Sequence, residues 1–102
     1  MPSTRLPAIE DLSPVQALQE IQIQVSLALE NPRTLEECEN LAASLGPQYE
    51  EDPEAISGLL RKVDPALFLD RLRKENPDFD LNQPLRETVQ NVVATLLSMR
   101  PA

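Results

Sequence analysis

Histidine and tryptophan are absent from this chain of 102 residues, glycine occurs twice and cysteine once. The lack of histidine excludes a Ser-His-Asp or Cys-His catalytic set and any metal site built on imidazole. The sequence also lacks a glycine-rich loop of the kind that cradles phosphates. We therefore expect a protein that is not an enzyme and that uses no cofactor or metal ion.

The single cysteine, Cys38, cannot form an internal disulfide, which fits a reducing compartment and leaves only an intermolecular bridge open. Its place on the apolar side of a predicted helix favours a buried, unreactive thiol. No apolar run approaches the roughly 18 residues of a membrane span, and residues 1–13 lack the continuous apolar region of a signal peptide. We expect a cytoplasmic protein that does not contact a membrane.

Aromatic residues are also scarce, since only Tyr49, Phe68 and Phe79 are present. The core therefore has to be aliphatic, which suits packed helices. Ten prolines separate segments of apolar periodicity and mark the ends of helices. These features predict an all-α fold, a compact single domain of about five short helices over residues 14–102, arranged as a bundle or an orthogonal array. Residues 1–13 carry two prolines and no helical period, which predicts a flexible N-terminal arm.

Capping residues predict where the first two helices begin. Ser13 stands before Pro14, the favoured arrangement of an N-cap followed by proline in the first helical position. This pair predicts a helix over about residues 14–29. Thr34 with Glu37 three residues later predicts a capping box, in which each side chain satisfies the other residue's backbone N–H at the start of a second helix.

Similar signals mark the remaining helices. Asp52 and Asp64 each precede a proline, so each predicts the N-cap of a short helix. Gly58 inside the first of these two helices costs about 1 kcal/mol relative to alanine, which a close helix crossing would offset. The last helix is expected to start near residue 83 or 84, after a turn capped by Asp80 or Asn82, and to end at residues 100–101.

Residues 21–29 carry an ambiguous pattern. Ile21, Ile23, Val25, Leu27 and Leu29 alternate with polar or small residues, which is typical of a strand. No second strand is evident, so such a strand would have to pair with another chain. Read as a helix, the segment places Ile23 and Leu27 on the side opposite its main apolar face. Either the other helices wrap this helix on both sides, or the second stripe binds a partner or a second copy.

Charge is unevenly distributed along the chain. The net charge is −8, and residues 1–54 hold eleven acidic and two basic side chains against six and seven in residues 55–102. This distribution disfavours nucleic acids and anionic membranes as partners and favours either a basic partner or a merely solvated acidic surface. Basic residues on the third and fourth helices follow an acidic segment, and separated charges of this kind can steer a partner protein into register.

These patterns predict a non-enzymatic, acidic, helical protein–protein interaction module that acts as a regulator, adaptor or assembly factor. Its partner would be another protein, with a second copy of the chain as one candidate. The candidate partner-binding residues are Ile23, Leu27, Glu50, Glu51, Asp52, Arg61, Lys62, Arg71, Arg73 and Lys74.

An alternative function comes from residues 41–62, which resemble the helix-turn-helix pattern of DNA-binding regulators. LAASLG is similar to the end of a first helix, and AISGLLRK is similar to a recognition helix. The resemblance implies DNA binding through Arg61 and Lys62. The turn is about four residues longer than the family pattern, and Glu50, Glu51, Asp52 and Glu54 would stand near the phosphates and repel them.

Residues 76–87 place Asn76, Asp78 and Asp80 at positions 1, 3 and 5 of a loop similar to a calcium-binding EF-hand loop, with Glu87 at position 12. Position 6 is Leu81, where the sharp turn of that loop requires glycine. We therefore expect a turn between two helices and no calcium site.

Overall fold

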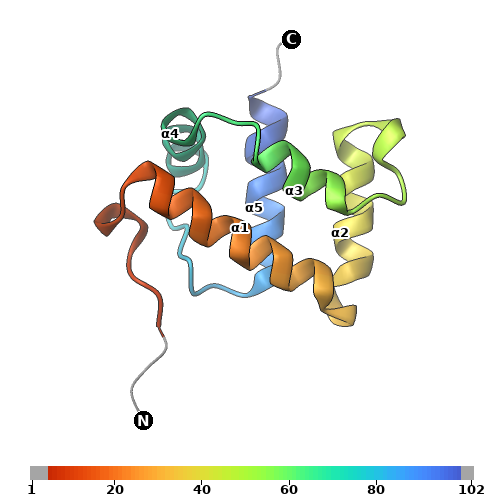
Figure 1. The fold of residues 1–102 in the computed structure, drawn as a ribbon, viewed down its shortest axis with the longest axis horizontal. Helices are drawn as coiled ribbons and strands as arrows, with labels where there is room; N and C mark the ends of the chain where they lie inside the picture. The colour runs from red at the N-terminus through yellow and green to blue at the C-terminus, as the bar shows by residue number, and fades with distance from the viewer. Residues whose placement is uncertain (1–4, 100–102) are drawn as a thin grey trace.

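The computed structural model describes residues 5–99 of the chain (Figure 1). The described residues form helices and no strands, in agreement with the predicted all-α fold. The strand interpretation of residues 21–29 is therefore wrong. The five α-helices are α1 (Pro14–Glu30), α2 (Pro32–Leu45), α3 (Glu54–Leu60), α4 (Pro65–Glu75) and α5 (Leu85–Ser98), and the two short 3-10 helices are η1 (Ile9–Asp11) and η2 (Pro47–Tyr49).

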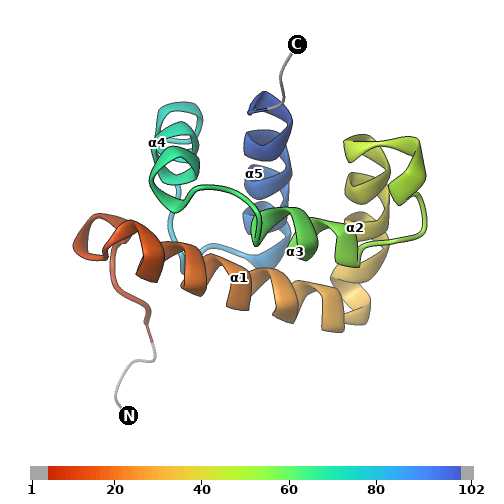
Figure 2. The ribbon, with the colours of Figure 1, turned by 45° about the horizontal axis from the view of Figure 1, so that its top comes forward.

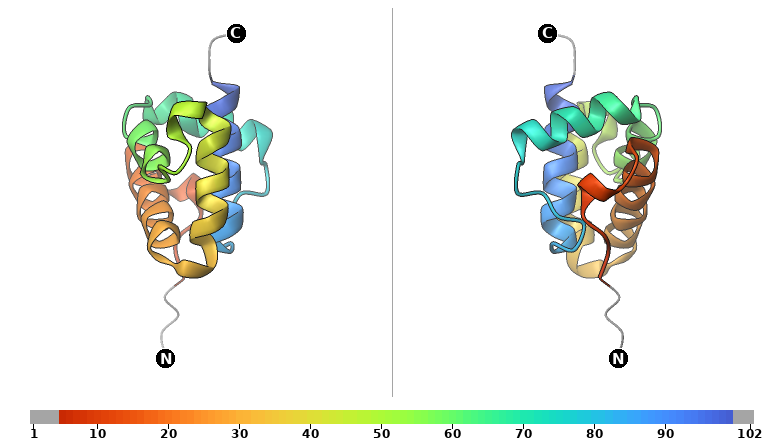
Figure 3. Two further views of the ribbon diagram at one scale, coloured as in Figure 1. Left: turned by 90° about the vertical axis from the view of Figure 1, so that its right-hand side faces the viewer. Right: turned by 90° about the vertical axis from the view of Figure 1, so that its left-hand side faces the viewer.

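The helices form an array with steep crossings. α2 and α5 lie side by side and run in the same direction, while α1 and α3 lie across them (Figures 1 and 2). α4 is viewed nearly along its axis in Figure 1 and from the side in Figure 3, where it crosses α5. Of the two predicted arrangements, the orthogonal array is the one observed.

Two of the predicted helix starts are confirmed by their side-chain caps. The Oγ of Ser13 accepts a hydrogen bond from the Gln16 N–H, and the Oε1 of Gln16 accepts one from the Ser13 N–H, which completes a capping box at α1. Asp64 Oδ1 accepts hydrogen bonds from the N–H groups of Ala66 and Leu67 at the start of α4. Both helices have proline in the first turn, where no N–H partner is lost.

The capping box predicted at Thr34 and Glu37 is wrong, because α2 begins two residues earlier than Thr34. Asn31 is its N-cap, with Oδ1 accepting a hydrogen bond from the Arg33 N–H at 2.9 Å. The hydroxyl of Thr34 instead donates to the carbonyl oxygens of Ala28 and Asn31. Thr34 therefore ties the start of α2 to the end of α1.

Three smaller expectations also need correction. α3 starts without a side-chain cap, so Asp52 is not its capping residue. α5 also lacks a side-chain cap, so neither Asp80 nor Asn82 starts that helix. A Cβ placed on Gly58 would meet nothing within 4 Å. Gly58 therefore does not serve a close helix crossing.

The core is a continuous aliphatic cluster that includes two phenylalanines, Phe68 and Phe79. α1 contacts all four other α-helices and forms the base of this core. Its buried residues are Ala17, Leu18, Ile21, Val25, Ala28 and Leu29. Cys38 is buried on α2, as its helical position predicted, and forms no disulfide.

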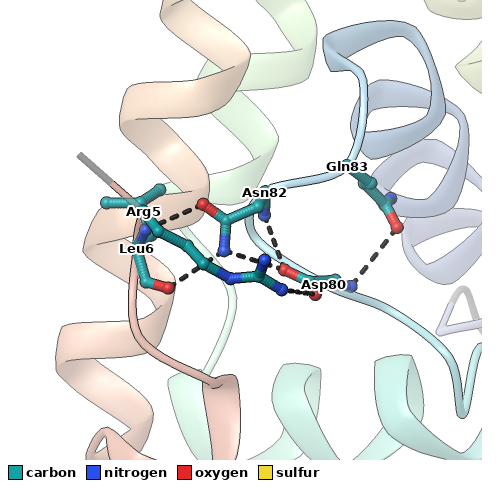
Figure 4. A network of polar contacts seen from close by, with 5 residues as sticks. All are labelled: Arg5, Leu6, Asp80, Asn82 and Gln83. Atoms are coloured by element: carbon teal, nitrogen blue, oxygen red, sulfur yellow. Dashed lines mark hydrogen bonds and ion pairs between the residues drawn. The ribbon is translucent and has the colours of Figure 1, made fainter. Parts of the chain in front are cut away.

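Residues 5–13, which belong to the predicted N-terminal arm, lie against the domain. Ile9 is buried in the core and Leu6 packs against it. The backbone of Leu6 forms two hydrogen bonds with the side chain of Asn82, and Arg5 forms an ion pair with Asp80 at 3.7 Å (Figure 4). We refer to residues 5–12 as the N-terminal strap. Residues 1–4 of the predicted arm lie outside the described residues.

Candidate functional site

The outer face of α1 carries an apolar pair that the core leaves uncovered. Ile23 is 50% exposed and Leu27 is 46% exposed, whereas the opposite face of the helix is buried. The two side chains are four residues apart and therefore adjacent on the helix surface. The interpretation of α1 as a helix wrapped on both sides is wrong, because about half of each of these two side chains is exposed.

A groove runs beside this apolar pair, between α1 and α3. It is an open hollow of about 530 Å³. We call it the α1 groove, and its lining residues are Gln19, Gln22, Ile23, Ser26, Leu27 and Glu30 of α1, with Ser57 and Arg61 from α3 and its C-terminal end. The fold thus brings together three residues that the sequence analysis selected separately: Ile23, Leu27 and Arg61.

The α1 groove combines apolar, hydrogen-bonding and charged side chains. Ile23 and Leu27 offer apolar area, and the carboxamides of Gln19 and Gln22 can donate and accept hydrogen bonds. One acid, Glu30, and one base, Arg61, supply charges of opposite sign. The groove therefore suits an amphipathic surface that carries apolar side chains and polar groups around them.

Two of the other predicted basic residues, Arg73 and Lys74, line a different hollow. This hollow lies between η1, α4 and the loop that follows α4, and Ile9 and Phe79 are among its apolar lining residues. Lys74 forms an ion pair at 3.2 Å with Asp70 one turn earlier on α4. Arg71 is exposed on the same helix and does not line this hollow. These residues lie outside the α1 groove.

The predicted acidic residues lie in the turn between η2 and α3. Glu50 and Glu51 are exposed, and Glu51 has a φ of 66°, a left-handed conformation that costs a residue with a side chain about 1–2 kcal/mol. Asp52 lines a shallow hollow together with Lys62 and Leu59. Opposite charges thus face the same hollow, and the ten predicted residues are divided among separate places on the surface.

The loop similar to an EF-hand has a packed structure of its own (Figure 4). Leu81 is buried, and Asp80 Oδ1 accepts hydrogen bonds from the backbone N–H and the side-chain Nδ2 of Asn82 at 2.7 and 3.1 Å. Asp80 also pairs with Arg5. Among residues 5–99, no group of three or more acidic, cysteine or histidine side chains is arranged to hold a metal ion.

Two titratable groups are perturbed, and both lie outside the α1 groove. Hydrogen bonds from the backbone and side chain of Asn82, together with the charge of Arg5, hold the pKa of Asp80 below its usual value. Burial raises the pKa of the Cys38 thiol, and the carboxylates of Glu37 and Glu39 raise it further. A thiol of this kind is a poor nucleophile, because little of it is ionised at neutral pH.

Sequence reasoning missed the polar lining of the α1 groove. Gln19, Gln22 and Ser26 are separated by three and four residues, so their common side of the helix could have been recognised from the spacing. Ser57 carried no such signal, because its position depends on how α3 crosses α1. The same is true of the place of Arg61 beside the apolar pair.

Comparisons of the chain with protein-family models, with curated proteins and with solved structures found no match. Within residues 5–99, no helix has the length and apolar character needed to cross a membrane.

Proposed function

We propose that this protein is a cytoplasmic protein–protein interaction module, acting as a small regulator, adaptor or assembly factor, and that it binds its partner through the α1 groove. The observation that supports this proposal is the pair Ile23 and Leu27, half exposed on a helix whose other face forms the core. The buried Cys38, which forms no disulfide, supports a reducing compartment.

An exposed apolar pair bordered by polar groups is typical of an interaction surface. Single apolar side chains on a surface need no explanation, but adjacent ones beside a groove indicate binding. Here Ile23 and Leu27 would supply the apolar centre, and Gln19, Gln22 and Ser26 the hydrogen-bonding rim. The separation of four residues is the spacing at which one amphipathic helix presents anchors to another.

The remaining candidate residues would contribute to orientation. Glu50, Glu51 and Asp52 precede α3, and Arg61 and Lys62 follow it, so the two ends of this short helix carry opposite charges. Exposed charges separated in this way change association rates and orientation more than affinity. Arg71, Arg73 and Lys74 on α4 would act at longer range in the same manner.

The helix-turn-helix alternative gains no support from α3. This helix has seven residues, and Ala55, Ile56, Ser57 and Leu60 are buried, which leaves little of it to enter a major groove. Lys62 shares its hollow with Asp52. DNA binding would show as salt-dependent affinity for duplex DNA that falls on Arg61→Ala or Lys62→Ala. We expect no binding to duplex DNA at low salt.

The test of the proposed function is affinity capture from the native cell with three forms of the chain. These forms are the wild type, the double variant Ile23→Lys with Leu27→Lys, and the control Leu67→Lys. Leu67 is 63% exposed on α4 and does not line the α1 groove, so the control makes the same chemical change elsewhere. Proteins captured by the wild type and Leu67→Lys but lost with the double variant support the proposal. Equal capture by all three forms, with unchanged circular dichroism, contradicts it.

A further inference from the structure

Charge is polarised along the α1 groove. Glu30 is the last residue of α1, and the last turn of that helix has no basic residue to offset the partial negative charge of its C-terminus. α3 runs antiparallel to α1, so its C-terminal end points toward the N-terminal half of α1 (Figures 1 and 2). Arg61 directly follows that end and lines the groove. The groove is thus acidic at one end and basic toward the other.

We infer that the occupant of the α1 groove is a second copy of this chain, with the exposed faces of the two α1 helices packed antiparallel. The two-fold axis passes between the helices at the level of residue 25, on the side of α1 opposite the buried Val25. This inference rests on the proposed function and specifies its partner. In an antiparallel pair centred on residue 25, Ile23 of one copy faces Leu27 of the other, and the same contact occurs twice by symmetry. Each exposed apolar side chain then acquires an apolar neighbour.

The same rotation matches the charges. Glu30 lies five residues beyond the axis, so in the dimer it is level with residue 20 of the other copy. It lies on the same side of α1 as the groove, and there it approaches Arg61 of the other copy. Glu20 is at the same level but lies on the other side of the apolar pair, where it faces Asn31 of the second copy. Glu30 and Glu20 of the two copies are therefore not paired. A parallel pair would instead set Glu30 against Glu30. The antiparallel arrangement is therefore the self-complementary one.

The size of the surface indicates a weak and reversible dimer. α1 has 17 residues and is therefore roughly 25 Å long, and one face of a helix of that length buries less than the roughly 800 Å² per partner of a standard interface. The net charge of −8 on each copy also opposes association. We expect monomer and dimer to exchange, with the dimer favoured as concentration rises.

The test is sedimentation analysis of two charge-reversed variants of the full chain, alone and mixed. Both Glu30 and Arg61 are exposed, so neither substitution disturbs the core, and circular dichroism verifies this. In a dimer of Glu30→Arg the new arginine meets Arg61 of the other copy, and in a dimer of Arg61→Glu the new glutamate meets Glu30. Each repulsion occurs twice by symmetry, so the self-association of either variant should weaken about tenfold or more. In an equimolar mixture, each variant supplies the charge that the other has lost, so the heterodimer should regain the affinity of the wild type.

Recovery of the affinity in the mixture cannot come from contacts within one copy, because no chain in the mixture carries both Glu30 and Arg61. Equal self-association of the wild type and both single variants, or no recovery in the mixture, overturns the antiparallel dimer. If the wild type is monomeric at all concentrations but the double variant at Ile23 and Leu27 still loses its captured proteins, the dimer is wrong and the proposed function stands. If the wild type is monomeric and capture is also unchanged, both are wrong.

Discussion

The side chain of Asn82 forms two hydrogen bonds with the backbone of Leu6, which lies 76 residues earlier in the chain. The Leu6 N–H donates to Oδ1 at 2.8 Å, and Nδ2 donates to the Leu6 carbonyl oxygen at 2.9 Å. Three residues further along the N-terminal strap, Ile9 is buried in the core. Asn82 therefore holds one end of the strap and the core holds the other.

Replacing Asn82 with alanine should loosen the strap. The substitution removes both hydrogen bonds to Leu6, and we expect a loss of about 1–2 kcal/mol in the free energy of unfolding and faster hydrogen exchange at the Leu6 amide. Asn40→Ala is the matched control, because Asn40 is exposed in the middle of α2 and alanine suits a helix interior. Unchanged exchange at Leu6 in Asn82→Ala would show that the two hydrogen bonds do not hold the strap.

The same loop gives the protein a specific pH dependence. The pKa of Asp80 is lowered in the folded state, so its contribution to stability is present above the ordinary carboxyl pKa of about 4 and is lost as the pH falls through the lower folded value. Asp80→Asn should therefore flatten the fall of stability below about pH 4, measured by denaturation at a series of pH values. In an Asn82→Ala background the effect should shrink only in part, because alanine removes the side-chain hydrogen bond to Asp80 but keeps the backbone N–H that is the largest cause of the shift. An equal effect in both backgrounds would contradict a contribution from the Asn82 side chain.

Two buried threonines on α5 allow a matched test of hydrogen bonding in the core. The hydroxyl of Thr88 is buried and has no hydrogen-bond partner within residues 5–99, whereas that of Thr95 donates to the Asn91 carbonyl oxygen at 2.8 Å. Thr88→Val should raise the free energy of unfolding by about 1 kcal/mol, because it removes an unpaired buried polar group. Thr95→Val should have no such gain. Urea denaturation measures both, and a stabilisation of equal size in the two variants would refute the distinction.

Local signals in the sequence predicted most of the helix boundaries. Ser13 and Asp64 act on backbone groups two or three residues away, so their caps depend on little beyond the neighbouring chain. The start of α2 was misjudged where a competing local cap, Asn31, preceded Thr34. Residues 21–29 form part of a helix despite their alternating pattern, because residues 5–99 contain no strand with which they could pair.

Such local signals could not predict contacts between residues that lie far apart in the sequence. Glu37 forms an ion pair with Arg86, with Nε and Oε2 2.7 Å apart, and accepts a hydrogen bond from Gln90. Both partners are on α5, so the Glu37 carboxylate stabilises a helix contact and not its own helix start. The contacts of the strap were not predictable for the same reason, since its partner Asn82 is far away in sequence. The sequence did separate Ile23 and Leu27 from the core-facing residues of α1, because that distinction depends only on helical periodicity.

The most direct test of the central claim is a methyl NMR experiment that observes Ile23 and Leu27 themselves. Spectra of the selectively labelled chain would be recorded as its concentration is raised and after addition of an extract of the native cell. If the α1 groove is the binding surface, the methyl signals of Ile23 and Leu27 will shift or broaden, while that of Leu67 on α4, which is more exposed than either, will stay unchanged. Unchanged Ile23 and Leu27 signals in both series, or changes centred on Leu67, would contradict the account.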